Sequence, residues 1–285
     1  MRKGFTLIEL IFVIVIFGIL SKFGADILYK IYENYIYSNT FNRLENQSEA
    51  AVKQIANRLQ YRIKDSTIAR DTITSTNIEP IGSNTGNENV LEWIGTDIDG
   101  WQGTSSTAPD WSGFIDLAAS SSATLNSPGT SITDPDLGIF FIGSNVDLNS
   151  SAFGWDGTNI KTSTTLTHAD IAIHPVDFTG TSISSAMTTA TDFNNSDVYE
   201  YYQLSRSAYA VSLDTATKKL WFYYDYQPWL GQSANTNGTP VLIMENVSSF
   251  KFTSMGDIMV IQVCVSDNNI TGVGEYSICK EKVVF

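Results

Sequence analysis

The chain begins Met1-Arg-Lys-Gly-Phe-Thr-Leu-Ile-Glu-Leu10 and continues Ile11-Phe-Val-Ile-Val-Ile-Phe-Gly-Ile-Leu20, and this stretch decides the fold. Two basic residues and a glycine precede an apolar run that contains a single carboxylate, Glu9. A secretory signal also has a basic start and an apolar core, but a small-residue cleavage site follows the core. No Ala-x-Ala-like site follows Leu20, and the plausible small-residue cut lies before the run, at Gly4. A cut there would leave the apolar segment in the mature chain.

These residues resemble the leader of type IV prepilins, in which Lys3-Gly4 precedes the cut and Phe5-Thr-Leu-Ile-Glu9 follows it. The resemblance covers residues 1–25. It implies that a membrane-embedded prepilin peptidase cleaves after Gly4 and N-methylates Phe5, the new amino terminus. It also implies assembly with other pilin or pseudopilin subunits at an inner-membrane assembly platform.

The apolar run predicts a membrane anchor. A helix over 5–20 is about 24 Å long at about 1.5 Å per residue, slightly short for a hydrocarbon core of about 30 Å. Extension to residue 24 closes the gap, with Lys22 reaching the interface. The positive-inside rule places Arg2 and Lys3 in the cytoplasm. We therefore expect a leader at 1–4, a transmembrane and filament-core helix at 5–24, and a periplasmic remainder that later enters a filament.

Glu9 is not explained by a plain anchor. A carboxylate in hydrocarbon costs about 2.5 kcal/mol or more, and such residues are functional candidates by default. The resemblance implies that Glu9 meets the amino-terminal amine of a neighbouring subunit and so sets subunit register, because a buried charge is tolerated when it is paired. The alternative is a signal anchor that carries one acid near its edge.

The helix is predicted to continue to residue 66, since no proline precedes Pro80. Its second part, 25–66, carries apolar residues at helical spacing, with charged residues on the other face. An amphipathic stripe of this kind requires a sheet to pack on. The predicted class is α+β and pilin-like, with a long amino-terminal helix packed on an antiparallel β-sheet.

The globular part, 67–285, reads as β-rich. It divides into a loop-rich β insertion at about 70–200 and a carboxy-terminal sheet at about 205–285. The order of strands over 208–265 resembles the larger minor pilins and the J-type pseudopilins. The predicted strands are 90–94, 114–117, 137–142, 170–173, 208–213, 219–226, 240–245, 247–252, 258–265 and about 275–284.

The two cysteines, Cys264 and Cys279, predict a disulfide, since their count is even and the chain is exported. In an antiparallel hairpin centred on Thr271-Gly272, opposed residues have numbers that sum to about 543, which is 264 + 279. Opposed residues lie close enough for a disulfide. The alternative is two buried free thiols on neighbouring strands.

Charge is unevenly distributed. The net charge is −13, and between residues 71 and 200 the only basic residue is Lys161. This region therefore predicts an acidic, polar surface, and it argues against nucleic-acid binding, which needs a basic face.

The sequence contains no nucleophile elbow, P-loop, zinc motif or dinucleotide fingerprint, so we predict no catalytic residue and no cofactor. His168 and His174 lack the further ligands of a zinc site and are predicted to be surface or edge residues. Asp97 and Asp99 begin a calcium-like loop whose later ligands are missing, so they are either calcium candidates or part of an ordinary acidic turn.

These features predict a minor type IV pilin, a structural subunit that primes assembly of a pilus or caps it. A bulky insertion argues against an abundant shaft subunit, which must repeat at close spacing. Two alternatives stay open. One is a minor pseudopilin of a type II secretion system. The other is a filament-displayed adhesin or ligand-binding protein.

Overall fold

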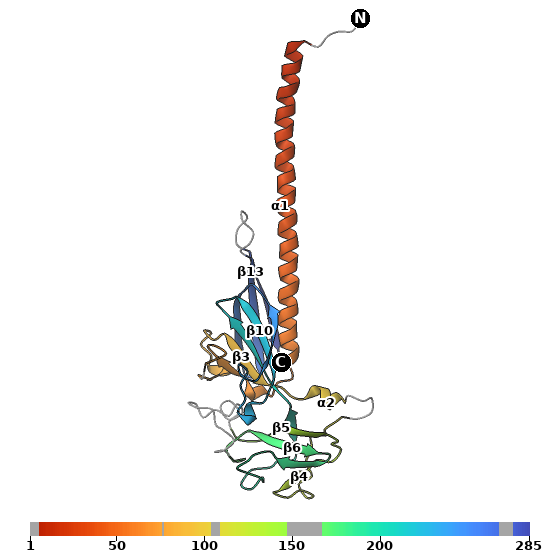
Figure 1. Ribbon diagram of the computed structural model, residues 1–285, viewed down its shortest axis with the longest axis vertical. Helices are drawn as coiled ribbons and strands as arrows, with labels where there is room; N and C mark the ends of the chain where they lie inside the picture. Colours follow the sequence, from red (N-terminus) through yellow and green to blue (C-terminus); the bar gives the residue numbers. More distant parts are fainter. Residues whose placement is uncertain (1–5, 76, 104–108, 147–166, 268–275) are drawn as a thin grey trace. The chain divides into compact units, whose positions relative to one another are not determined.

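The structure is a computed structural model that describes residues 6–75, 77–103, 109–146, 167–267 and 276–285 (Figure 1). It is an α+β protein with a long amino-terminal helix and antiparallel sheets, as predicted. The chain divides into two compact units, Met1–Gln47 and Ser48–Phe285.

The long helix, α1, runs from Leu7 to Leu59 and ends before the predicted residue 66. Beyond its end the backbone N–H of Ile63 donates to the carbonyl oxygen of Ile94 at 2.9 Å. A single 3-10 turn, η1 at Lys64–Ser66, follows. The helix therefore ends just before the chain forms a backbone hydrogen bond with the last residue of the Val90–Ile94 strand.

The largest sheet has six antiparallel strands in the order β11-β10-β9-β3-β1-β2. Because β3 lies between β9 and β1, this early segment belongs to the same sheet as the carboxy-terminal strands. The separate β region thus begins after β3, not at about residue 70. The strands are β1 (Ile68–Arg70), β2 (Glu79–Pro80), β3 (Val90–Ile94), β9 (Ala208–Asp214), β10 (Lys219–Tyr226) and β11 (Thr239–Met244).

A second sheet has three strands, β12 (Val247–Met255), β13 (Ile258–Asp267) and β14 (Tyr276–Val284). Cys264 lies opposite Cys279 in the β13–β14 ladder, and the two form the disulfide that the sequence predicts, with their Cα atoms 4.0 Å apart. The predicted turn at Thr271-Gly272 lies outside the described residues.

We expect the double variant Cys264→Ser, Cys279→Ser to lose about 3 kcal/mol of unfolding free energy, the value for a closed loop of about 15 residues. Urea unfolding of the oxidised full chain and of the variant measures the difference. Reductant should lower the midpoint of the parent chain and leave the variant unchanged. Equal midpoints for both chains would contradict a stabilising disulfide.

A third sheet has five strands in the order β4-β7-β6-β5-β8, and we call the region that contains it, residues 98–205, the inserted lobe. The lobe has a hydrophobic core of its own, which includes Trp111, Phe141, Phe178 and Tyr202. Its strands are β4 (Thr124–Asn126), β5 (Thr133–Phe141), β6 (Ile173–Thr179), β7 (Ser182–Ser185) and β8 (Tyr202–Ser205). The remaining helices are α2 (Ile98–Gln102), η2 (Ile81–Ser83) and η3 (Pro228–Leu230).

Two predicted strands of this lobe are wrong. At 114–117 there is only an isolated bridge from Phe114 to Tyr201, because the Asp116 carboxylate accepts the backbone N–H groups of Ala118 and Ala119 and turns the chain. At 170–173 the strand begins only at Ile173, since the Asp170 carboxylate is bonded to the backbone of Thr167. Both acids stabilise turns of the kind that Asp favours.

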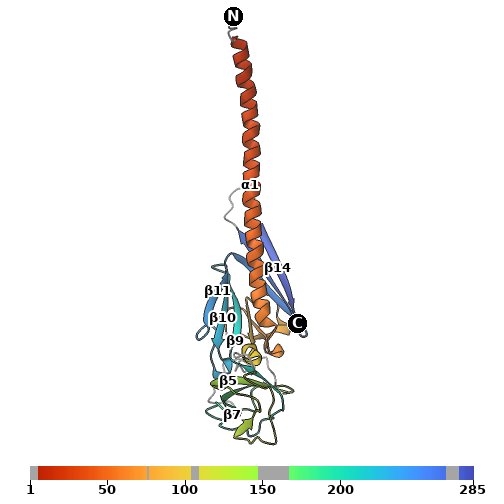
Figure 2. The ribbon, with the colours of Figure 1, turned by 90° about the vertical axis from the view of Figure 1, so that its right-hand side faces the viewer.

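The last turns of α1 pack into the second unit with the predicted apolar stripe buried. Ala51, Val52, Ile55 and Leu59 are each at most 3% exposed. Figure 2 shows this part of α1 with β9–β11 on one side and β14 on the other. Lys64, just beyond the helix, forms an ion pair of 2.9 Å with Asp257, between β12 and β13. The apolar stripe at the end of α1 is therefore buried within the second unit.

Candidate functional site

The amino-terminal turn of α1 contains Glu9, one of the predicted site residues. Its Oε2 atom accepts hydrogen bonds from the backbone N–H of Thr6 at 3.0 Å and from the Thr6 hydroxyl at 2.9 Å. Thr6 and Glu9 have the spacing of a capping box, and the Glu9 carboxylate supplies one half of it by accepting the backbone N–H of Thr6 at the helix start. The other predicted residues, Lys3, Gly4 and Phe5, lie outside the described residues.

The helix beyond Glu9 presents an apolar surface. Among the described residues, α1 is the one helix long and apolar enough to cross a membrane, and none of its most apolar 18-residue window is buried within the protein. The side chains of Phe12, Ile14 and Phe17 are each at least 62% exposed. Exposed apolar surface of this extent marks a membrane or protein contact.

Residues 1–21 match the family model of the prokaryotic N-terminal methylation motif. The chain carries the type IV prepilin signal. The signal implies processing by a prepilin peptidase and assembly with other pilin subunits, and together with the apolar helix it fits an inner-membrane anchored pilin. No curated protein and no solved structure matches the chain.

The two calcium candidates have separate surroundings. Asp97 is buried and caps α2, because its Oδ1 accepts the backbone N–H of Gly100 at 3.1 Å. Its Oδ2 forms an ion pair of 2.8 Å with Nε of Arg206. Asp99 is exposed. No group of three or more His, Cys, Asp or Glu that could hold a metal ion occurs among the described residues. The Asp97 carboxylate thus neutralises an arginine.

The prediction that the two histidines are surface or edge residues is wrong. Both lie in the interior of the inserted lobe. His168 is 1% exposed and His174 is 2% exposed. Their Nδ1 atoms are 3.0 Å apart, and Nε2 of His168 is 2.7 Å from the Ser185 hydroxyl. These hydrogen bonds satisfy both ring nitrogens of His168 and Nδ1 of His174, which helps to explain why burial is tolerated. Burial lowers the pKa of His168 to about 4 and that of His174 to about 3.

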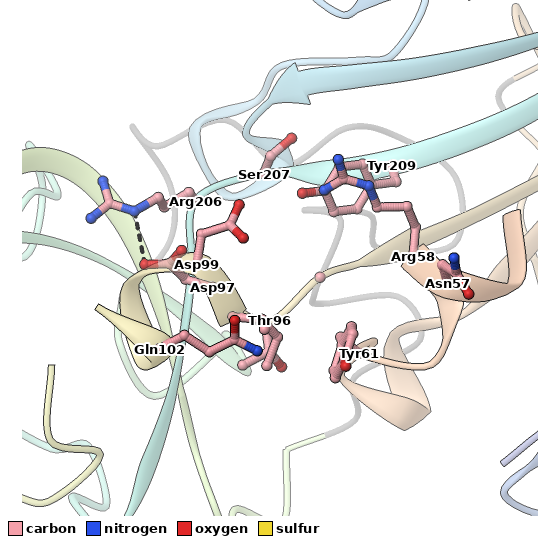
Figure 3. Close-up of a pocket in the computed structure, with 12 residues that line it drawn as sticks. Asn57, Arg58, Tyr61, Thr96, Asp97, Asp99, Gln102, Arg206, Ser207 and Tyr209 are labelled. Carbon is pink, nitrogen blue, oxygen red and sulfur yellow. Dashed lines mark hydrogen bonds and ion pairs between the residues drawn. The ribbon is translucent and has the colours of Figure 1, made fainter. Parts of the chain in front are cut away.

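A polar cleft of about 350 Å³ lies where the end of α1, the segment after β3 and the segment before β9 meet (Figure 3). Arg58 and Tyr209 lie on one side, with the guanidinium carbon 5.7 Å from the ring centroid, and Asp97, Asp99 and Gln102 lie on the other. The remaining lining residues are Asn57, Tyr61, Gly95, Thr96, Ile98, Arg206 and Ser207.

Sequence reasoning misses this cleft, because its walls come from three segments that are distant along the chain. The signal that was available is weak. Residues Thr96-Asp-Ile-Asp-Gly100 read as an acidic turn, which the structure confirms as the start of α2, but nothing local pairs it with Arg58 or Arg206. The pairing arises only from the sheet order, in which β3 lies next to β9.

Proposed function

We propose that the protein is a minor type IV pilin that primes assembly of a pilus or caps it. The observation that carries this proposal is the methylation motif at residues 1–21, followed directly by the exposed apolar face of α1. A subunit of this kind is cleaved after Gly4, methylated on Phe5, held in the inner membrane, and then added to a filament through its helix.

The inserted lobe favours a minor subunit over an abundant one. It has its own five-stranded sheet and its own core, so it is a rigid addition and not a loop that compacts. Subunits of a filament shaft repeat at close spacing along the helix. A rigid lobe is accommodated more easily at a tip, where no subunit follows.

In this proposal Glu9 acts in assembly. Cleavage creates a charged amine on Phe5, four residues before Glu9, and the same amine on every neighbouring subunit. An apolar filament core favours pairing of these opposite charges. In the single chain the Glu9 carboxylate is bonded to Thr6, so the neighbour's amine would add to the capping box or replace it.

The proposed division follows from this role: a leader at 1–4, a transmembrane and filament-core segment at 5–24, an amphipathic continuation of the helix from 25 to its end at Leu59, and a periplasmic domain at 67–285. The platform that adds subunits to the filament would be the inner-membrane partner. A minor pseudopilin of a type II secretion system has the same parts, and loss of secretion without loss of pili on gene deletion would favour that role.

We expect Gly4→Val to block processing, because the side chain would occupy the position at which the peptidase accepts glycine. Intact-mass analysis of the membrane-extracted chain from its native host measures the result. The parent chain should begin at N-methylated Phe5, and the variant at Met1.

Gly18→Val is the matched control. It adds the same side chain inside the apolar run, where a Cβ meets nothing within 4 Å in the single chain. This variant should still be cleaved. A parent chain that begins at Met1 or beyond Leu20 would remove the main support for the proposal and bring the alternative of an anchored ligand-binding protein to the front.

A further inference from the structure

The cleft beside the end of α1 is electrically balanced. Its lining contains two arginines, Arg58 and Arg206, and two aspartates, Asp97 and Asp99. Arg206 is bound to Asp97 at 2.8 Å and also contacts Asp134, so its charge is neutralised by the protein itself. Apart from this ion pair, the lining offers the Asp99 carboxylate, which would repel a phosphate, and the Arg58 guanidinium, which would repel a cation. The charge balance therefore favours a neutral ligand.

The same lining is rich in groups that bond to hydroxyls. Asn57 and Gln102 each offer an amide donor and an amide acceptor, Asp99 accepts, and Arg58 donates. Within the part of the chain that the structure describes, no hydrogen bond joins the side chains of Asn57, Asp99 and Gln102 to the other lining residues, and all three line the cleft. Paired donors and acceptors of this kind match neighbouring hydroxyls on a sugar ring.

An aromatic surface completes the cleft. Tyr61 follows the last turn of α1 and is 42% exposed, although its backbone is fixed by hydrogen bonds to Arg58 and Thr96. In Figure 3 Tyr61 lies beside the end of α1, across from Thr96 and Gln102. A tyrosine combines an apolar ring face with a polar tip. The C–H face of a sugar can pack on the ring while its hydroxyls reach the amides.

We propose that this cleft binds a neutral carbohydrate. Its volume of about 350 Å³ falls within the range of pockets for small ligands, about 300–1,000 Å³, and suits one or two sugar rings. Tyr61 packs against a ring, while Asn57, Asp99 and Gln102 bond to hydroxyls and Arg58 closes the far wall. This inference goes beyond assembly and is independent of it, because the cleft lies outside the apolar part of α1.

The test uses the full chain, extracted in a zwitterionic detergent, since a glycosidic detergent carries a sugar head group of its own. The chain is applied to an array of neutral and acidic glycans of one to four rings. We expect retention on at least one neutral glycan. Tyr61→Ala and Gln102→Ala should each lower the affinity for it at least tenfold, whereas Tyr61→Phe, which keeps the ring, should change it less than threefold.

Tyr201→Ala is the matched control, because Tyr201 is 57% exposed, lies in the inserted lobe and does not line the cleft. Its affinity should equal that of the parent chain. Retention of no neutral glycan, retention of acidic glycans alone, or equal affinity in the Tyr61→Ala and Gln102→Ala variants would each overturn the proposal. The pilin assignment is tested by the intact mass of the chain and not by glycan retention. A chain that binds no glycan but begins at N-methylated Phe5 would therefore overturn the carbohydrate proposal alone.

Discussion

Replacing Glu92 by alanine is expected to lower the free energy of unfolding by about 3–5 kcal/mol, the cost of removing one partner of a buried ion pair. Glu92 lies on β3 and is 1% exposed, and Arg70 on β1 is 6% exposed. The Nε atom of Arg70 is 2.8 Å from Oε2 of Glu92. Without the carboxylate, the guanidinium charge would stay in the interior of the six-stranded sheet without its counter-ion.

A third strand is tied to the same carboxylate. The hydroxyl of Tyr226, at the end of β10, donates to Oε1 of Glu92 at 2.7 Å. Burial, reinforced by the charge of Glu92, raises the pKa of Tyr226 well above its ordinary value, so the hydroxyl remains a donor. Glu92 thus joins β1, β3 and β10, and its loss would remove the acceptor of the buried Tyr226 hydroxyl and the carboxylate paired with Nε of Arg70.

Urea unfolding of the full chain in detergent, followed by near-ultraviolet circular dichroism, measures the effect. Glu245→Ala is the matched control, since Glu245 is 58% exposed and pairs with Lys219 at 3.3 Å. An exposed pair contributes about 0–1 kcal/mol, so this variant should unfold close to the parent. The double variant Arg70→Met, Glu92→Leu should recover part of the loss, because apolar replacements leave no buried charge while the Tyr226 hydroxyl still lacks its acceptor. A loss below 1 kcal/mol for Glu92→Ala would show that the pair is not buried in solution.

Local sequence pattern was sufficient for the carboxy-terminal sheets. The β9–β10 turn forms because the Asp214 carboxylate accepts the backbone N–H groups of Ala216 and Thr217. The sequence predicts this turn because a short polar segment separates two apolar runs. The β13–β14 register follows from counting outward from a turn. In both cases the information lies within one hairpin, so residues adjacent in sequence determine the structure.

The parts that were missed depend on distant residues. Strands β4 and β7 are short, and their apolar signal is carried by single residues, Leu125 and Ile183, which pair with one another and are buried in the core of the inserted lobe. Prediction of the cleft likewise requires the order of strands in the six-stranded sheet, in which β3 lies next to β9. The histidines were misplaced for a related reason: a sequence cannot show that two polar rings satisfy each other.

We expect the protein to lose stability as the pH falls from about 6.5 to about 4, through the buried pair His168 and His174. Ordinary histidine has a pKa of 6.5, and burial holds the folded-state pKa of His168 at about 4 and that of His174 at about 3. Between these values the unfolded chain binds protons and the folded chain does not. Stability is therefore complete above pH 6.5 and declines below it.

The hydrogen bonds explain why His168 stays neutral in the folded protein. The Ser185 hydroxyl donates to the carbonyl of Ala190, so it must accept from Nε2–H of His168. The neutral His168 ring then has Nδ1 as an acceptor, which receives Nδ1–H of His174 at 3.0 Å. A proton on Nδ1 of His168 would place two N–H donors face to face. The charge of Asp192 favours the charged form of His168, but it does not offset the effect of burial on the pKa.

The chain has only two histidines, and between pH 6.5 and 5.5 they dominate the difference in proton uptake, because carboxylates such as Glu88, with a folded-state pKa of about 2, contribute mainly at lower pH. With both rings protonated in the unfolded chain alone, the unfolding free energy should fall by up to about 2.7 kcal/mol per pH unit near pH 5, twice the value of about 1.36 kcal/mol for one proton. Urea unfolding of the full chain at pH 7.5, 6.5, 5.5 and 5.0 measures the slope.

The double variant His168→Gln, His174→Phe is the control, because it keeps a donor to Ser185 and removes both titrating histidines. Its slope between pH 6.5 and 5 should approach zero even if its stability at pH 7.5 is lower. A flat profile for the parent chain, or an equal slope in the double variant, would mean that other groups control its response to acid.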